Sequence, residues 1–207
     1  MSYRIARSAT DRAAVLRLRD AVYVRDQGRL LDVRDTADTF DRFDAAASYI
    51  LAFAETNPIG AVKVVADLHG GLPCEDMQDL RSLRLPGNRL VEFGHLMTLP
   101  EVRSRSVGMG LMREALRHAV TQFSATHIVG DFFADEKAGG LRDFYSTIGF
   151  TPVGGCYADH RFAGNPLSIV GVLDIRAAVR RTMADTEQKN RLLQYFFGDY
   201  HTYTAAS

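Results

Sequence analysis

Hydrophobic positions along the chain switch between the spacing of strands and the spacing of helices. Short apolar runs bounded by turn residues predict strands, and apolar positions three or four apart predict amphipathic helices. Strands are predicted at Tyr3 to Ala6, Tyr49 to Glu55, Gly60 to Ala66, Leu90 to Leu99, His127 to Phe133 and Leu167 to Leu173. Helices are predicted from Ser8 or Thr10 to about Asp26, around Asp76 to Arg81, through Met112 to Phe123 and over Gly139 to Ile148. This order indicates an α/β protein with a mixed sheet.

Length and composition favour one globular domain with an appendage. The 207 residues are 46% hydrophobic and 24% charged, which is ample material for one core. We expect a domain over residues 1–175 and a helical, aromatic extension over residues 176–207. The extension should pack on the domain itself, with a homodimer contact or a lid over an acyl tunnel as alternatives. Its aromatic residues are Tyr195, Phe196, Phe197, Tyr200 and Tyr203.

The balance of charge argues against several classes of partner. Lysine plus arginine and aspartate plus glutamate both total 25, so nothing directs the chain to nucleic acid. No apolar run approaches the roughly 20 residues of a membrane span, and the N-terminus lacks a signal-peptide core, so we expect a cytoplasmic protein. Two cysteines and six dispersed histidines show no metal-ligand spacing, so no metal is expected.

The most informative stretch runs from Arg105 to Leu111, where two glycines one residue apart open a predicted helix directly after a strand. Glycine lets a ligand approach the backbone closely, and the first amides of a helix point toward an anion. By itself Gly-x-Gly often marks only a turn, but its place between a strand and an amphipathic helix indicates a phosphate or pyrophosphate site.

A second motif, Phe144 to Phe150, predicts a helix end, a glycine stop and the start of a strand. Together the two motifs resemble the GNAT acyltransferase superfamily. The resemblance implies a GNAT-like mixed, mostly antiparallel central sheet flanked by helices on both faces. It also implies that Tyr145 protonates the departing thiolate and that the backbone around Leu96 and Met97 binds the thioester arm. The residues that it assigns to coenzyme A pyrophosphate are Arg105, Val107, Gly108, Met109, Gly110 and Leu111.

The N-terminal third resembles one branch of that superfamily, the acyl-homoserine lactone synthases and N-acyl amino acid synthases. Arg19 and Tyr23 look like part of the branch's helix end, Asp41 and Asp44 like its Asp-x-aromatic-Asp signature, and Glu92 like its strand acid. Four residues apart, Arg19 and Tyr23 share a helix face, and the guanidinium could bind a carboxylate. The two aspartates could hold an amine or pair with Arg19; alternatively, Arg19 lies on the surface and the aspartates only cap turns.

Departures from the lactone synthases shift the prediction. Lys63 and His95 stand where those enzymes have arginine, and Leu30 lies near the position of their tryptophan. The well-formed glycine loop also looks more like that of an enzyme using coenzyme A than one using a carrier protein. These features favour the N-acyl amino acid synthases.

Acyl transfer to an amine needs a base, donors for the oxyanion and an acid for the sulfur. Glu92 is the predicted base if burial raises its pKa, and His95 competes for that role. In a regular strand the two would face opposite sides of the sheet, but a bulge at Gly94 would bring both toward the cleft. Tyr145 is the predicted acid.

We therefore expect an N-acyltransferase that uses an acyl-CoA or acyl-carrier-protein thioester and a small amine such as an amino acid, by direct attack. One alternative is an ordinary acetyl-CoA-dependent N-acetyltransferase, and another is a non-catalytic acyl-CoA sensor. The sequence does not distinguish acyl length, acceptor, donor carrier or oligomeric state.

Overall fold

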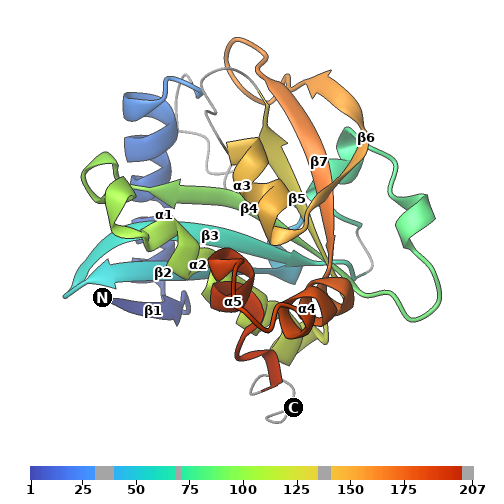
Figure 1. Cartoon of the computed structure of the whole chain (residues 1–207). Helices are drawn as coiled ribbons and strands as arrows, with labels where there is room; N and C mark the ends of the chain where they lie inside the picture. The colour runs from blue at the N-terminus through green and yellow to red at the C-terminus, as the bar shows by residue number, and fades with distance from the viewer. Residues whose placement is uncertain (31–39, 69–70, 135–140, 202–207) are drawn as a thin grey trace.

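A single mixed sheet organises the structure, of which a computed structural model describes residues 1–30, 40–68, 71–134 and 141–201. Seven strands pair in the order β1-β2-β3-β4-β5-β7-β6 (Figure 1). All neighbours are antiparallel except β4 and β5, which run parallel, so the predicted mixed, mostly antiparallel sheet is confirmed. The strands are β1 (Ser2–Ile5), β2 (Ala47–Ala54), β3 (Asn57–Ala66), β4 (Leu90–Thr98), β5 (His127–Phe133), β6 (Thr151–Ala158) and β7 (Leu167–Asp174).

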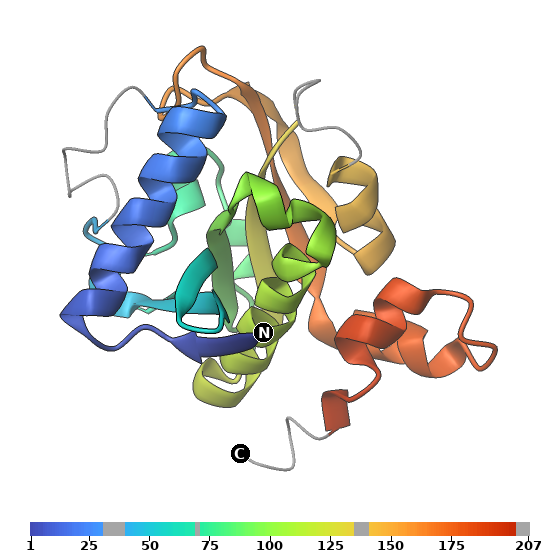
Figure 2. The same ribbon diagram turned by 90° about the vertical axis from the view of Figure 1, so that its left-hand side faces the viewer.

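Helices cover both faces of this sheet, as predicted. On one face lies α1 (Ala9–Arg19), which continues as the π-helix η1 (Asp20–Asp26). On the other face lie α2 (Val107–Phe123), α3 (Leu141–Ile148), α4 (Ile175–Ala184) and α5 (Arg191–Phe197). Figure 2 shows α1 on one side of the molecule and α3, α4 and α5 on the other. Short 3-10 turns connect the elements: η3 (Asp44–Ala46), η4 (Pro73–Asp76), η5 (Arg81–Leu83) and η6 (Pro100–Arg105).

The start of α1 follows the sequence signal closely. Ser8 is the cap: its Oγ accepts a hydrogen bond from the Asp11 backbone nitrogen at 3.1 Å, and the Asp11 carboxylate accepts one from the Ser8 nitrogen. Arg4 of β1 donates to both Asp11 carboxylate oxygens. This contact, together with the backbone donors, holds the pKa of Asp11 well below its usual range.

The core divides at the sheet according to strand alternation. Val62 and Val64 of β3 pack beneath α2, whereas Ala61 and Val65 face the side of α1. Since every residue from Ile59 to Ala66 is buried, β3 is covered on both faces. Lys63 lies within this buried run, so its charge needs a partner of opposite sign.

The C-terminal helices complete the core on the α2 side. Leu193, Phe196 and Phe197 of α5 are buried in the same cluster as α2, so this aromatic segment packs on its own domain. Tyr203 lies outside the described residues. In the described ranges, no helix combines the length and apolarity needed to cross a bilayer.

Gly60 lies where β3, β4 and α2 pack closely together, so a substitution there tests this packing. A Cβ at this position would lie 2.8 Å from the Met97 carbonyl oxygen and 3.0 Å from Leu111 Cδ1. Because a backbone carbonyl cannot move aside cheaply, we predict that Gly60→Ala lowers the free energy of unfolding by about 1–3 kcal/mol in urea denaturation.

The matched control is Gly155→Ala in β6, where an added Cβ would meet no atom of the described residues within 4 Å. Its free energy of unfolding should stay within about 0.5 kcal/mol of the wild type. Equal losses for both alanines would contradict the close packing around Gly60.

Candidate active site

The site begins where β4 and β5 part. Their parallel pairing ends at Phe93 and Gly130, although both strands continue beyond it. On its other edge β4 carries a bulge, because Lys63 pairs with Gly94 while Ala61 pairs with Met97. The extra residue falls at His95 or Leu96, and His95 adopts a left-handed φ of 48°. The bulge thus lies at the two residues that follow the predicted Gly94.

A cleft of about 960 Å³ passes through the sheet at this separation. Phe93 and Phe132 line it from the α2 face, while Glu92 and Asp131 line it from the α1 face. The cleft therefore joins the two sides of the sheet. Among the residues predicted from sequence, those lining it are Arg19, Tyr23, Asp41, Glu92, His95, Leu96, Gly108 and Tyr145.

Glu92 is a buried acid, 3% exposed, in the middle of β4. Its Oε2 accepts a hydrogen bond from the Cys74 backbone nitrogen at 2.9 Å, at the start of η4. Burial raises the pKa of Glu92 to about 7, and the neighbouring Asp131 charge adds to this, while Cys74 and Arg161 oppose it. A carboxyl group with this pKa exchanges a proton readily near neutrality.

His95 is held from the helix side of the cleft. Arg19 Nη1 lies 3.1 Å from its Nδ1, and the Tyr23 ring packs edge-on against it at 6.3 Å. Burial, with the positive charges of Arg19 and Lys63, lowers the pKa of His95 well below its usual range. A neutral imidazole that accepts a hydrogen bond from arginine is a poor base, so Glu92 is the better candidate.

Tyr145 reaches the cleft from α3 on the opposite face. Its ring stacks on Phe132, with ring centroids 3.8 Å apart. Phe132 in turn lies over two paired glycines, Gly130 and Gly171, where an added Cβ would come within 3 Å of its ring. Burial raises the pKa of Tyr145, so the phenol stays protonated and can act as a donor.

The glycine turn forms the other end of the cleft, at the start of α2. Ser106 precedes the helix with a left-handed φ of 59°, and its side chain does not cap the helix, so the first amides can face an anion. Gly108 lines the cleft. Gly110 must be glycine for a different reason, because a Cβ there would lie 1.9 Å from the hydroxyl of Tyr3 in β1.

The remaining predicted loop residues contribute differently. Val107 and Leu111 are buried in the core, and Met109 packs against it partly buried. Met97 is buried on the α1 face, so only its backbone could meet a thioester arm. The side chain of Arg105 lies outside those described.

The two predicted acceptor-side aspartates separate in the structure. Asp41 lines the cleft and pairs with the buried Lys63 at 2.9 Å, so its partner is Lys63 rather than Arg19. Asp44 pairs with Arg12 at 2.8 Å and does not appear among the cleft-lining residues.

Among the charged cleft residues that were missed from the sequence, three are joined by ion pairs: Asp131, Asp159 and Arg161. Asp131 carried a usable signal, because a carboxylate inside an apolar strand needs a partner or a purpose. Arg161 follows β6 in a loop, and no local pattern connects it to β5. Among the described residues, no three acidic, histidine or cysteine side chains gather to hold a metal ion.

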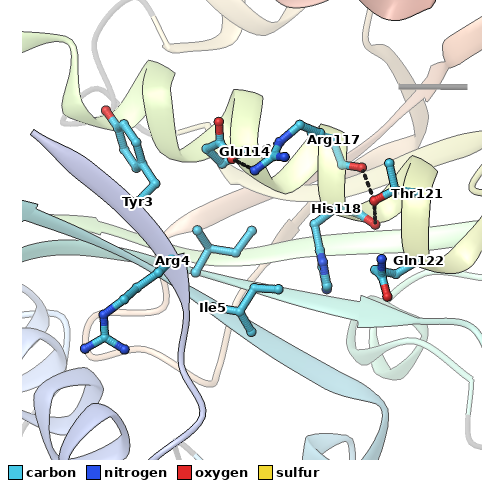
Figure 3. A pocket seen from close by; sticks show the side chains of 9 residues that line it. Tyr3, Arg4, Ile5, Glu114, Arg117, His118, Thr121 and Gln122 are labelled. Atoms are coloured by element: carbon cyan, nitrogen blue, oxygen red, sulfur yellow. Dashed lines mark hydrogen bonds and ion pairs between the residues drawn. The ribbon is translucent and has the colours of Figure 1, made fainter. Parts of the chain in front are cut away.

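A second hollow, of about 220 Å³, lies between β1 and α2 (Figure 3). Arg4, Glu114, Arg117 and His118 line it, and none of the predicted catalytic or binding residues does. It is therefore separate from the cleft that holds Glu92 and Tyr145.

Comparison with known proteins identifies the family of the chain. The model of the family described as N-acyl amino acid synthase FeeM matches residues 14–172, which is more than half of the chain. The chain belongs to the FeeM N-acyl amino acid synthase family. It is therefore an acyltransferase of the N-acyltransferase type. No curated protein matches the chain.

Solved structures confirm the GNAT-type fold. FeeM, an N-acyl amino acid synthase from uncultured soil microbes, is 19% identical with a TM-score of 0.70, covering 84% of this chain and 90% of its own. Escherichia coli ElaA is 18% identical with a TM-score of 0.58, covering 83% and 99%. An acyl-CoA N-acyltransferase from Pseudomonas aeruginosa is 17% identical with a TM-score of 0.58, covering 83% and 97%.

The raised pKa of Glu92 predicts a dependence of stability on pH. Its pKa is 4.5 unfolded and about 7 folded, so ionising it costs the folded state stability as pH rises through this window. Glu92→Gln removes that cost. Relative to wild type, the variant's free energy of unfolding should therefore increase by about 2–3 kcal/mol between pH 5 and pH 8, measured in urea.

Asp11→Asn is the control for this measurement. Asp11 is also buried, judged by its solvent exposure, but its lowered pKa keeps it ionised across the whole range, so its effect on stability should be the same at pH 5 and pH 8. A Glu92→Gln difference that did not change with pH would contradict a protonated Glu92 in the folded state.

Proposed function

We propose that the protein transfers an acyl group from an acyl-CoA thioester to the amino group of an amino acid, by direct attack. One observation carries the proposal: a single cleft crosses the sheet with Glu92 on one face and Tyr145 on the other. A base and an acid on opposite sides of the reacting carbon are what transfer from sulfur to nitrogen requires. Membership of the FeeM family supports the amino acid as acceptor.

The donor would enter from the α2 face. The first amides of α2 suit the pyrophosphate of coenzyme A. Beyond Phe93 the edge of β4 no longer pairs with β5, so its backbone groups can hydrogen-bond the thioester arm. The bulge at His95 and Leu96 also leaves an amide available to the carbonyl oxygen, where negative charge develops during attack.

Each face of the sheet would supply one proton-transfer group. The acceptor arrives on the Glu92 side as an ammonium ion and gives one proton to the Glu92 carboxylate. The free amine then attacks the thioester carbon, and the tetrahedral intermediate collapses by breaking the carbon–sulfur bond. Tyr145 supplies a proton to the thiolate and becomes a phenolate. The attacking nitrogen still carries one proton more than an amide does, and it releases this proton to the Tyr145 phenolate as the neutral amide forms.

The lining of the cleft supports acyl chains longer than acetyl. Tyr23, Phe133 and Phe162 pack together, with Phe162 5.9 Å from Tyr23 and 5.0 Å from Phe133, ring centre to ring centre. With Leu30 they form an apolar wall of the cleft. Burying each further methylene contributes about 0.8 kcal/mol, so such a wall favours longer donors.

The test is thiol release from CoA thioesters of increasing length, acetyl to palmitoyl, in a mixture of the twenty common L-amino acids, with products identified by mass spectrometry. We predict N-acyl amino acids, formed faster from longer donors. Glu92→Gln should lower kcat about 10²–10⁴-fold and Tyr145→Phe about 10–10³-fold, because each removes a proton-transfer group.

Cys156→Ser is the control, since this exposed thiol lies in β6 and should be dispensable. Acetyl-CoA as the sole donor would favour an ordinary acetyltransferase instead. Binding of CoA without thiol release for any amine would indicate a sensor, and Tyr145→Phe would then change nothing. Product formation only with an acyl-carrier-protein thioester would show that the donor is the acyl-carrier protein rather than acyl-CoA.

A further inference from the structure

An arginine–aspartate pair closes the cleft beside Glu92. Asp131 follows Gly130, the last residue of β5 that pairs with β4. Because it lies two residues beyond Val129, which pairs with Glu92, it shares the face of Glu92. Arg161 Nη2 donates to Asp131 Oδ2, and Asp159 holds the same guanidinium through Nε at 2.8 Å and Nη2 at 2.7 Å. Asp159, 1% exposed, thus fixes Arg161 in place.

One of the two carboxylate oxygens of Asp131 lacks a hydrogen-bond partner in the described part of the chain. Its Oδ1 is buried and accepts no hydrogen bond within the described part of the chain, although the side chain lines the cleft. Burial raises the pKa of Asp131, against a lowering by Arg161 and by the Tyr157 hydroxyl, which lies near the carboxylate but forms no hydrogen bond with Oδ1. A buried carboxylate oxygen without a donor is costly unless a ligand supplies one.

The Arg161 guanidinium has a free donor that complements this acceptor. In the described residues, Arg161 donates through Nε and Nη2, and no hydrogen bond is made by Nη1. With 36% of its side chain exposed, Arg161 reaches the cleft and keeps a donor free. A free acceptor and a free donor therefore flank one fixed ion pair.

We propose that Asp131 and Arg161 bind the acceptor as a zwitterion, with Asp131 Oδ1 accepting from its ammonium group and Arg161 Nη1 donating to its carboxylate. This rests on the proposed function and assigns recognition of the acceptor's α-amino acid group to residues beyond Arg19 and Asp41. An α-amino acid carries both charges on one carbon, which matches opposite charges held side by side. Asp131 keeps its charge throughout, while the ammonium proton passes to Glu92.

A purely structural ion pair is the competing explanation, and it predicts a different kinetic pattern. If Asp131 only braces Arg161, its removal lowers stability and affects donor and acceptor alike. If Asp131 binds the ammonium group, the acceptor KM changes and the acyl-CoA KM does not.

The experiment is steady-state transfer by the full chain, with saturating acyl-CoA and varied concentrations of the best L-amino acid from the wild-type screen. Asp131→Asn should raise the acceptor KM about 10- to 100-fold and leave the acyl-CoA KM within about twofold, because one charged hydrogen bond is lost. For wild type, replacing the amino acid by its amide should raise KM at least about tenfold. The defect of Asp131→Asn should persist with the amide, which still carries the ammonium group.

Asp76→Asn is the matched control: it removes the same charge from the rim of the same cleft, where Asp76 is 54% exposed and pairs with Arg42. Its acceptor KM should stay near wild type. An unchanged acceptor KM for Asp131→Asn, or an equal increase for both asparagine variants, would overturn the assignment while the transferase stands. Wild type that acylates other amines but no amino acid would overturn the proposed acceptor, and the zwitterion site with it.

Discussion

The separation of β4 and β5 is the constraint on which the rest of the site depends. Two parallel strands pair over four residues and then part, because the bulge on β4 turns its course away from β5. In the reaction that we propose, a thioester from the α2 face meets an acceptor on the α1 face at this opening. Gly130 and Gly171 let Phe132 lie flat beside the opening and hold Tyr145 against it.

Charge is distributed unevenly across that opening. On the α2 face, Phe132 and Tyr145 present two stacked aromatic rings and one protonated hydroxyl. On the α1 face, Asp41 and Lys63 neutralise one another, and Arg161 bridges two aspartates. Such pairing offsets the cost of burying these charges. Glu92 has no cationic hydrogen-bond partner in the described part of the chain, so its pKa stays near neutrality.

Sequence predicted the fold well, because the fold depends on local signals, and the glycine turn that we propose as the donor end is a local pattern too. The Gly108 turn opens a helix after a strand, and Ser8 with Asp11 forms a capping box, patterns contained within a few residues. The acceptor end that we propose depends on a contact between distant segments, because Asp131 and Arg161 lie 30 positions apart. At Gly110 a local pattern gave the wrong reason for the residue. The motif indicated ligand binding, but the group that comes close to Gly110 is the Tyr3 side chain.

A crystal structure with coenzyme A and an N-acyl amino acid would show whether the reaction occurs through the gap between β4 and β5. We expect the pyrophosphate at the start of α2, the sulfur between β4 and β5, and the amino acid head group on the Glu92 face. Both ligands on the same face, or strands paired across the gap when ligands are bound, would contradict this expectation.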